Sequence, residues 1–236
     1  MDLMLSGDQE AVRDAIREVL REQASSERVR AALASEDAFD ARLWSTAAEL
    51  GWFGLSVPEA RGGAGYGLPE AMVLFVELGR SLAPGAWLGT VSAAHALGAA
   101  SQRNETLATV LGGARVAMID DPQNRLGQGA VADGTDANVI DGGAATHVLV
   151  LGSDAVRIVD ARHTTREARP CTDPTRRMPR VRFERATATI VSSDAASLRR
   201  RATVLAAAEA AGVAERALEM SVEYAKVREQ FGRPIG

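Results

Sequence analysis

The sequence predicts an α+β fold, with an N-terminal helical domain, a central antiparallel β-domain and the start of a second helical domain. Two changes of periodicity predict it. Helical spacing of apolar residues extends from about residue 6 to 111, short β-type runs follow to about residue 190, and helical spacing returns from about residue 194 to 227. We therefore expect three domains, at residues 1–112, 113–193 and 194–236.

The first region is predicted to contain four helices. Ser6 is a suitable N-cap for the first of them, and Gln9, three residues on, completes a capping box. Apolar residues then recur on one face of the helix. Gly and Pro residues stop the helices that follow, which we expect within residues 39–52, 68–85 and 90–100.

The second region contains short apolar runs separated by turn residues. No helix of useful length lies between them, and parallel strands need such a crossover connection. We therefore expect an antiparallel sheet. Its strands are expected at residues 114–119, 137–140, 147–151, 155–160, 180–184 and 186–191.

The third region is predicted to be one long helix. Asp194 is a suitable N-cap at its start. Gly212 and many alanines predict that the backbone of this helix packs closely against a neighbouring helix. The segment FGRPIG then stops the helix, because Gly232 can turn the chain freely and Pro234 cannot continue a helix.

Composition argues against several classes of function. Lys and Arg number 27 and Asp and Glu number 31, so the net charge of −4 argues against nucleic acid or an anionic membrane as a partner. The single cysteine, Cys171, has no partner for an internal disulfide. No apolar stretch reaches the roughly 18 residues that a membrane span needs, and the N-terminus lacks the pattern of a signal peptide. We therefore expect a soluble, cytoplasmic protein.

The short motifs that often reveal chemistry do not predict a site here. The glycine loop RGGAGYG, residues 61–67, follows a helix, so it lacks the strand–loop–helix context of a dinucleotide site. No G-x-S-x-G elbow occurs. Metal binding is not expected, because no ligand spacing connects the histidines, which are His95, His147 and His163.

Two arginine-rich segments, residues 175–185 and 197–202, raise the possibility of a nucleic-acid patch. They are not interleaved with aromatic residues on which bases could stack. We expect solvated faces or an ion-pair surface between subunits instead. The residues alone therefore predict three structural regions and no catalytic group.

Two longer segments are more specific. In residues 49–90 an LG…GL…PE..GG.G loop precedes a helix that ends in E.LGR.L.P, and residues 224–236 have the pattern Y.K.R.QFG.PIG. In both segments, and in their order around a sheet, the chain resembles the acyl-CoA dehydrogenase family. The resemblance covers essentially the whole chain and is weakest in the sheet.

This resemblance implies oxidation of an acyl-CoA thioester to the α,β-enoyl thioester. In the family a glutamate removes the α-proton while the β-hydride passes to N5 of FAD, and hydrogen bonds stabilise the developing enolate charge. The resemblance therefore implies FAD as cofactor and an acyl-CoA as substrate. It also implies a homo- or hetero-oligomer and electron-transfer flavoprotein as a partner.

The resemblance assigns cofactor contacts to the last helix and the turn after it. Arg228 matches the arginine that reaches across a dimer interface to the FAD pyrophosphate, for which a guanidinium fork is well suited. Gln230 and Phe231 match neighbouring positions that contact the adenosine half of FAD. The alternative is that Arg228 only stabilises the C-terminus of its helix. A family loop that we expect to be mainly structural is matched by Pro58, Glu59, Gly62, Gly63 and Gly65.

The chain departs from the family pattern where the sheet would hold the flavin. Asp120 and Asp121 stand on the first strand, where the family usually has an uncharged polar start. Asp141 replaces a hydroxyl on a later strand. Carboxylates at these places would repel an anionic cofactor. The sequence therefore predicts a weakened flavin site on this chain's own sheet.

The catalytic base of the family is also missing. In members that carry the base on the helix with R.QFG, its position falls here on Ala202, which cannot accept a proton. Glu209 and Glu215 lie on the same helix at other turns. We therefore expect no catalytic residue in this chain.

In the family, the helix with R.QFG begins a four-helix bundle that is otherwise missing here, so we expect a truncated chain. The apolar face of this helix should make the isolated chain poorly soluble, or should cause the chain to associate with another subunit. The altered sheet positions, the missing base and the segment DPTRRMPRVRFE at residues 173–184 resemble a bacterial branch of the family. Enzymes of that branch are built from two different subunits and act on bulky thioesters such as steroid side-chain CoA. The alternatives are a non-catalytic partner of a dehydrogenase and a flavin-dependent monooxygenase of the same fold.

Overall fold

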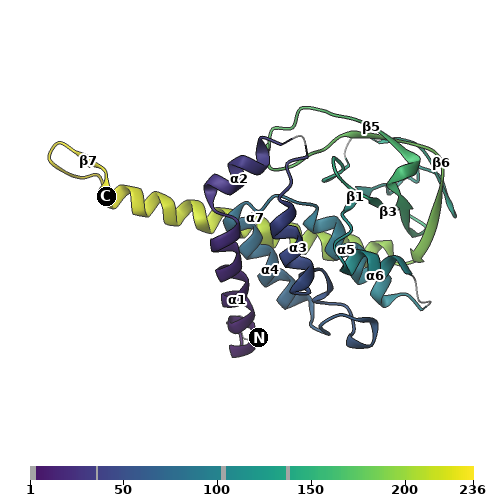
Figure 1. Cartoon of the computed structure of the whole chain (residues 1–236), viewed down its shortest axis with the longest axis horizontal. Helices are drawn as coiled ribbons and strands as arrows, with labels where there is room; N and C mark the ends of the chain where they lie inside the picture. Colours follow the sequence, from purple (N-terminus) through teal and green to yellow (C-terminus); the bar gives the residue numbers. More distant parts are fainter. Residues whose placement is uncertain (1–3, 36, 102–104, 137–138) are drawn as a thin grey trace.

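The computed structural model describes residues 4–35, 37–101, 105–136 and 139–236. Figure 1 shows a cluster of helices from the first half of the chain, a sheet on one side of it, and a long helix that passes the cluster and projects beyond it. The α+β class and the order of helical region, sheet and helix are therefore confirmed.

The helical region begins at the expected capping box. The backbone N–H of Gln9 donates to the Ser6 hydroxyl at 3.3 Å, and that of Ser6 donates to the Gln9 side-chain oxygen at 3.1 Å. Two helices, α2 and α6, are not predicted by the sequence because each is too short to show a periodic apolar face. The helices are α1 (Gly7–Gln23), α2 (Ser26–Leu33), α3 (Ala41–Glu49), α4 (Leu68–Ser81), α5 (Trp87–Ala99) and α6 (Glu105–Leu111).

Buried aromatic residues join these helices. The Trp44 ring of α3 lies 4.5 Å from that of Phe53 and 4.7 Å from that of Trp87 of α5, measured between centroids. Apolar side chains of the sheet, including Leu149 and Ile158, belong to the same core. One face of the sheet is therefore packed on the helices, and its other face encloses a second, smaller core.

The sheet is mixed rather than wholly antiparallel. Its strand order is β1-β3-β4-β6-β2, with β5 also paired to β6. The antiparallel expectation is confirmed for every described pair in this sheet except β1–β3, which run parallel with Val116 opposite His147. Between β1 and β3 the chain crosses to the far edge of the sheet and forms β2 there. It then returns so that β3 runs in the same direction as β1. The strands are β1 (Val116–Asp120), β2 (Val131–Asp136), β3 (His147–Leu151), β4 (Val156–Asp160), β5 (Thr164–Glu167) and β6 (Arg180–Ser192).

Some strands differ from the expected runs. The sequence does not predict β2 and β5, because VADGTD and TTRE are too polar for an apolar strand pattern. The two expected runs at residues 180–184 and 186–191 form the single strand β6, which continues past Arg185 at a φ of 49°. The expected run at residues 137–140 lies partly outside the described residues, and its Ile140 forms a bridge with Met118.

Helix α7 (Ala195–Val227) has 33 residues and is about 50 Å long. The Asp194 carboxylate accepts the Ser197 backbone N–H at 2.9 Å, as expected of an N-cap. A Cβ at Gly212 would lie 2.0 Å from the Val76 carbonyl oxygen of α4, and one at Gly79 of α4 would lie 2.0 Å from the Glu209 carbonyl oxygen. The predicted close packing at Gly212 is confirmed, because glycines from both helices allow the two backbones to touch.

The end of the chain projects from the body as an arm, which we define as residues 213–236 (Figure 1). It ends in a hairpin of β7 (Glu229–Gln230) and β8 (Arg233–Pro234). Phe231 and Gly232 form the two-residue turn, with φ values of 56° and 78°. The segment FGRPIG therefore stops the helix, as expected. The arm exposes the apolar side chains of Val213, Leu218, Met220, Val222, Tyr224 and Val227.

Candidate functional site

The residues that the sequence assigns to the cofactor lie together on the arm. The Arg228 backbone N–H donates to the Tyr224 carbonyl oxygen at 2.8 Å and so ends α7. Its guanidinium is exposed and, within the described residues, makes no hydrogen bond or ion pair. Phe231 is fully exposed at the hairpin tip, and Gln230 bonds only to the adjacent Glu229 carbonyl oxygen, at 2.8 Å. All three lie far from this chain's own sheet (Figure 1).

The two carboxylates at the end of β1 have separate roles. Asp121 is fully buried and accepts the backbone N–H groups of Arg125 and Leu126, at 2.9 and 2.8 Å, so it caps the loop that follows β1. Asp120 points to α7, where the Arg199 guanidinium contacts it at 2.7 Å. The expected pair of free, repelling carboxylates is therefore not what the structure contains. One carboxylate is turned inward and the other is neutralised.

Asp141 forms an ion pair as well. Its carboxylate lies 3.0 Å from the Arg176 guanidinium, which also contacts the Glu209 carboxylate of α7. Asp141 is buried in a left-handed backbone conformation, with a φ of 57°. Burial raises the pKa of Asp141 to about 7, although the positive charge of Arg176 acts in the opposite direction. Burial also raises the pKa of Glu209.

These ion pairs join the end of β1 and the turn after Ile140 to one helix; Asp141, expected on a strand, lies in that turn. Arg199 and Glu209 both belong to α7, and the first binds Asp120 directly while the second binds Asp141 through Arg176. Ten residues of helix separate them, which is about 15 Å. Both positions at which the family resemblance places flavin contacts are thus occupied by contacts to this chain's own α7.

No free carboxylate stands at the position of the family base. Ala202 is buried in the core between α7 and the helical region. Glu209 is held by Arg176, and Glu215 by Arg80 of α4, at 2.7 Å. The two glutamates that the sequence offers on this helix therefore hold α7 in place through ion pairs.

The other sequence features are structural where the structure describes them. Within the described residues no three His, Cys, Asp or Glu side chains gather as a metal site, and no helix is long and apolar enough to cross a membrane. In the glycine loop, a Cβ on Gly63 would lie 2.2 Å from the Val57 carbonyl oxygen, so the loop is closely packed on its own start. In the arginine-rich segment 175–185, Arg177 donates to the carbonyl oxygens of Leu33 and Ser35.

Arg176 and Arg199 are the important residues that the sequence analysis does not single out. Each has a carboxylate partner far away in the chain, 35 residues in one case and 79 in the other. Arg176 lies in an irregular segment without periodicity, and Arg199 is one of three consecutive arginines. The signal in the sequence is the pair of unexpected carboxylates at Asp120 and Asp141, because a carboxylate that packs against the body needs a cation or amides as partners.

Comparison with known proteins identifies the class. The model of the acyl-CoA dehydrogenase N-terminal domain matches residues 6–114, and that of the acyl-CoA dehydrogenase C-terminal domain matches residues 198–236. Acyl-CoA dehydrogenase IpdE2 of Mycobacterium tuberculosis is 36% identical over 234 residues, covering 97% of this chain and 67% of the relative. The chain belongs to the acyl-CoA dehydrogenase family.

Two solved assemblies resemble the chain in structure. The ChsE4-ChsE5 complex from Mycobacterium tuberculosis matches with a TM-score of 0.86 and 26% identity, over 100% of this chain and 71% of the matched one. A variant of the Tcur3481-Tcur3483 steroid ACAD matches with a TM-score of 0.83 and 28% identity, over 97% and 69%. The chain thus spans about two thirds of the length of these relatives.

Proposed function

We propose that this chain is one subunit of an FAD-dependent acyl-CoA dehydrogenase built from two different subunits. In that assembly its arm supplies Arg228, with Gln230 and Phe231, to an FAD held mainly by the companion subunit. The observation that carries the proposal is the Arg228 guanidinium, which is exposed on a projecting arm and has no partner within the described residues.

The chemistry of Arg228 fits the pyrophosphate of FAD. A guanidinium presents a planar fork of donors that matches phosphate oxygens in bidentate geometry. The Phe231 ring offers an apolar face for an adenine base, and the Gln230 amide offers a donor and an acceptor. An arm that leaves these groups outside the body can act only on a ligand that another molecule brings.

The sheet of this chain fits FAD poorly, which supports placing the cofactor in the companion. At two positions where the family resemblance leads us to expect flavin contacts, Asp120 is paired with Arg199 and Asp141 with Arg176. A flavin there would have to displace both contacts and would leave at least one carboxylate beside its own negative charge. When bound in the assembly, FAD would supply the acceptor for the β-hydride of the acyl-CoA. We propose that this chain binds the pyrophosphate of the FAD.

The apolar side of the arm supports a companion subunit in contact with it. Leu218 is 66% exposed and Val227 75% exposed on the projecting part of α7, whose first turns are held to α4 by the ion pairs of Glu215 and Glu219 with Arg80. Covering such side chains stabilises an interface by about 25 cal/mol per Å² of apolar area. The names of the two similar assemblies each join two proteins, and one is a steroid ACAD. We therefore propose a bulky, steroid-type acyl-CoA as the substrate.

A second candidate is a non-catalytic partner that stabilises a dehydrogenase and contributes only the arm. Ala202 at the position of the base, together with the ion pairs of Glu209 and Glu215, favours this reading of the chain. Bleaching of the flavin absorbance by an acyl-CoA tests whether the assembly carries out dehydrogenation. It should require an intact acidic residue in the companion if this chain supplies no base.

The test is FAD retention by the two-subunit assembly. We expect Arg228→Ala to weaken FAD binding about ten- to a hundredfold, because it removes charge-assisted hydrogen bonds to phosphate. Arg228→Lys should restore part of the loss. Arg233→Ala is a matched control, since Arg233 lies exposed in the same hairpin and its side chain has no hydrogen bond or ion pair within the described residues. Equal FAD retention by the wild type and Arg228→Ala would remove the assignment.

A further inference from the structure

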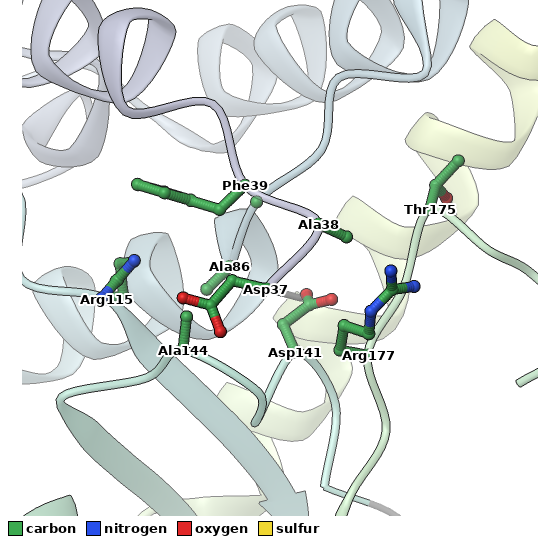
Figure 2. Close-up of a pocket in the computed structure, with 10 residues that line it drawn as sticks. Asp37, Ala38, Phe39, Ala86, Arg115, Asp141, Ala144, Thr175 and Arg177 are labelled. Carbon is green, nitrogen blue, oxygen red and sulfur yellow. The ribbon is translucent and has the colours of Figure 1, made fainter. Parts of the chain in front are cut away.

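A line of hollows lies between α3, the segment before β1 and the loop before β3, on the body and away from the arm. The smallest, about 20 Å³, is shown in Figure 2, where Arg115 and Asp37 face it together with Phe39. Phe39 and Arg115 also line a groove of about 700 Å³, and Thr146 connects that groove to another of about 640 Å³. Grooves of this size match the usual range for small-molecule sites.

Four arginines line these hollows, which are Arg115, Arg162, Arg166 and Arg177, and two of them, Arg115 and Arg166, lie on either side of the loop before β3. The Arg115 guanidinium stacks over the Phe39 ring, with its carbon 4.4 Å from the ring centroid, and it makes no hydrogen bond or ion pair within the described residues. Arg166 of β5 lies against the loop before β3, where it donates to the carbonyl oxygens of Gly143, at 2.8 Å, and Ala145. Both arginines are therefore held in position without a carboxylate partner in the described part of the chain.

The charges around the two arginines leave them short of negative charge. The pKa of Arg166 is lowered, first by burial and then by the neighbouring charge of Arg115, while Asp37 acts in the opposite direction. The other acidic groups along the hollows are already engaged. Asp141 pairs with Arg176 at 3.0 Å, Asp160 with Arg162 at 2.6 Å, and Glu49 accepts the Ser45 hydroxyl at 3.1 Å.

We propose that Arg115 and Arg166 form a binding site for the phosphate group of a phosphorylated small molecule. Two neighbouring cations of like charge are stabilised by an oxyanion that contacts both, and phosphate matches the guanidinium fork. Asp37 competes with that anion for Arg166. The grooves on either side of Thr146 accommodate the rest of the molecule. This site is separate from the arm and does not depend on the proposed cofactor role of Arg228.

The probe is inorganic pyrophosphate, titrated calorimetrically into the assembly at low ionic strength, with sodium chloride of matched ionic strength as the blank. We expect saturable binding by the wild type. Arg115→Met and Arg166→Met should each weaken it about tenfold or more, since each removes charge-assisted hydrogen bonds. Asp37→Asn should tighten it, because the competing carboxylate is lost. Arg228→Ala should leave it unchanged, which separates this site from the cofactor arm.

A second titration with ADP identifies the source of the phosphate. Tighter binding than that of pyrophosphate, with the same dependence on Arg115, places a nucleoside in the groove. Equal binding supports recognition of the phosphate alone. The proposal is overturned if the wild type shows no saturable binding, or if Arg115→Met binds pyrophosphate as the wild type does. Because Asp37→Asn removes no cation and no hydrogen bond of the two arginines, its result stands even if Arg166→Met fails to fold.

Discussion

Replacing Asp141 by asparagine should make the protein more stable at neutral and mildly alkaline pH. The side chain is buried beside Arg176, and burial raises its pKa from 3.8 to about 7. Asparagine has the same shape, carries no charge and tolerates the left-handed backbone, which here has a φ of 57°. Arg176 keeps its contact with Glu209, so the variant leaves no cation without a partner.

The sign of the effect follows from the direction of the pKa shift. A carboxyl whose pKa is higher in the folded state binds its proton on folding, so it stabilises at low pH and this contribution is lost as pH rises through about 4 to 7. The difference between 3.8 and about 7 corresponds to about 4 kcal/mol at about pH 8. Glu209 shares Arg176 with Asp141, so the two carboxyl groups titrate together and the value is an upper limit.

The measurement is urea unfolding of the wild type and Asp141→Asn between about pH 5 and pH 8, followed by the fluorescence of the buried tryptophans. We expect the stability advantage of the variant to grow with pH toward about 4 kcal/mol. Asp160→Asn is a control of opposite sign, since Arg162 lowers the pKa of Asp160 to about 2 and its charge is therefore stabilising. A variant of Asp141 that is less stable than the wild type at every pH would refute the reasoning.

Two further predictions concern α7. Gly212→Ala should destabilise the fold by about 3 kcal/mol, because its Cβ would lie 2.0 Å from the Val76 carbonyl oxygen. Urea unfolding measures this loss of stability. Gly7→Ala is the control and should be neutral, because no atom lies within 4 Å of a Cβ at Gly7. An equal effect of both variants would contradict the close helix crossing. Leu218→Ser should leave the fold unchanged but weaken the assembly about thirtyfold, or about 2 kcal/mol, as sedimentation against subunit concentration would detect. Unchanged association would show that this face of the arm is not covered.

Local sequence features predict local structure well in this protein. The capping box at Ser6, the N-cap at Asp194 and the close approach at Gly212 are all confirmed, because each depends on residues within a few positions or on a single side chain. The parallel pairing of β1 with β3 is not predictable in this way. Periodicity indicates that a segment is a strand, but not which strand it pairs with or in which direction.

The same limit applies to the candidate site. The sequence marks Asp120 and Asp141 as departures from a family pattern, and their charge alone predicts repulsion of a cofactor. The structure gives each a cation from a distant segment, Arg199 or Arg176, so that neither carboxylate is left without a partner. Such pairs depend on the tertiary fold. The cofactor roles of Arg228, Gln230 and Phe231 stay predictions.

The most direct test of the account is the FAD content of this chain purified alone and purified together with its companion subunit. We expect the chain to be colourless when alone and to show a flavin absorbance only in the joint assembly, because the arm completes a site built mainly by the other molecule. Stoichiometric FAD on the isolated, monomeric chain would contradict it, since the bound flavin would then have to be held without any companion.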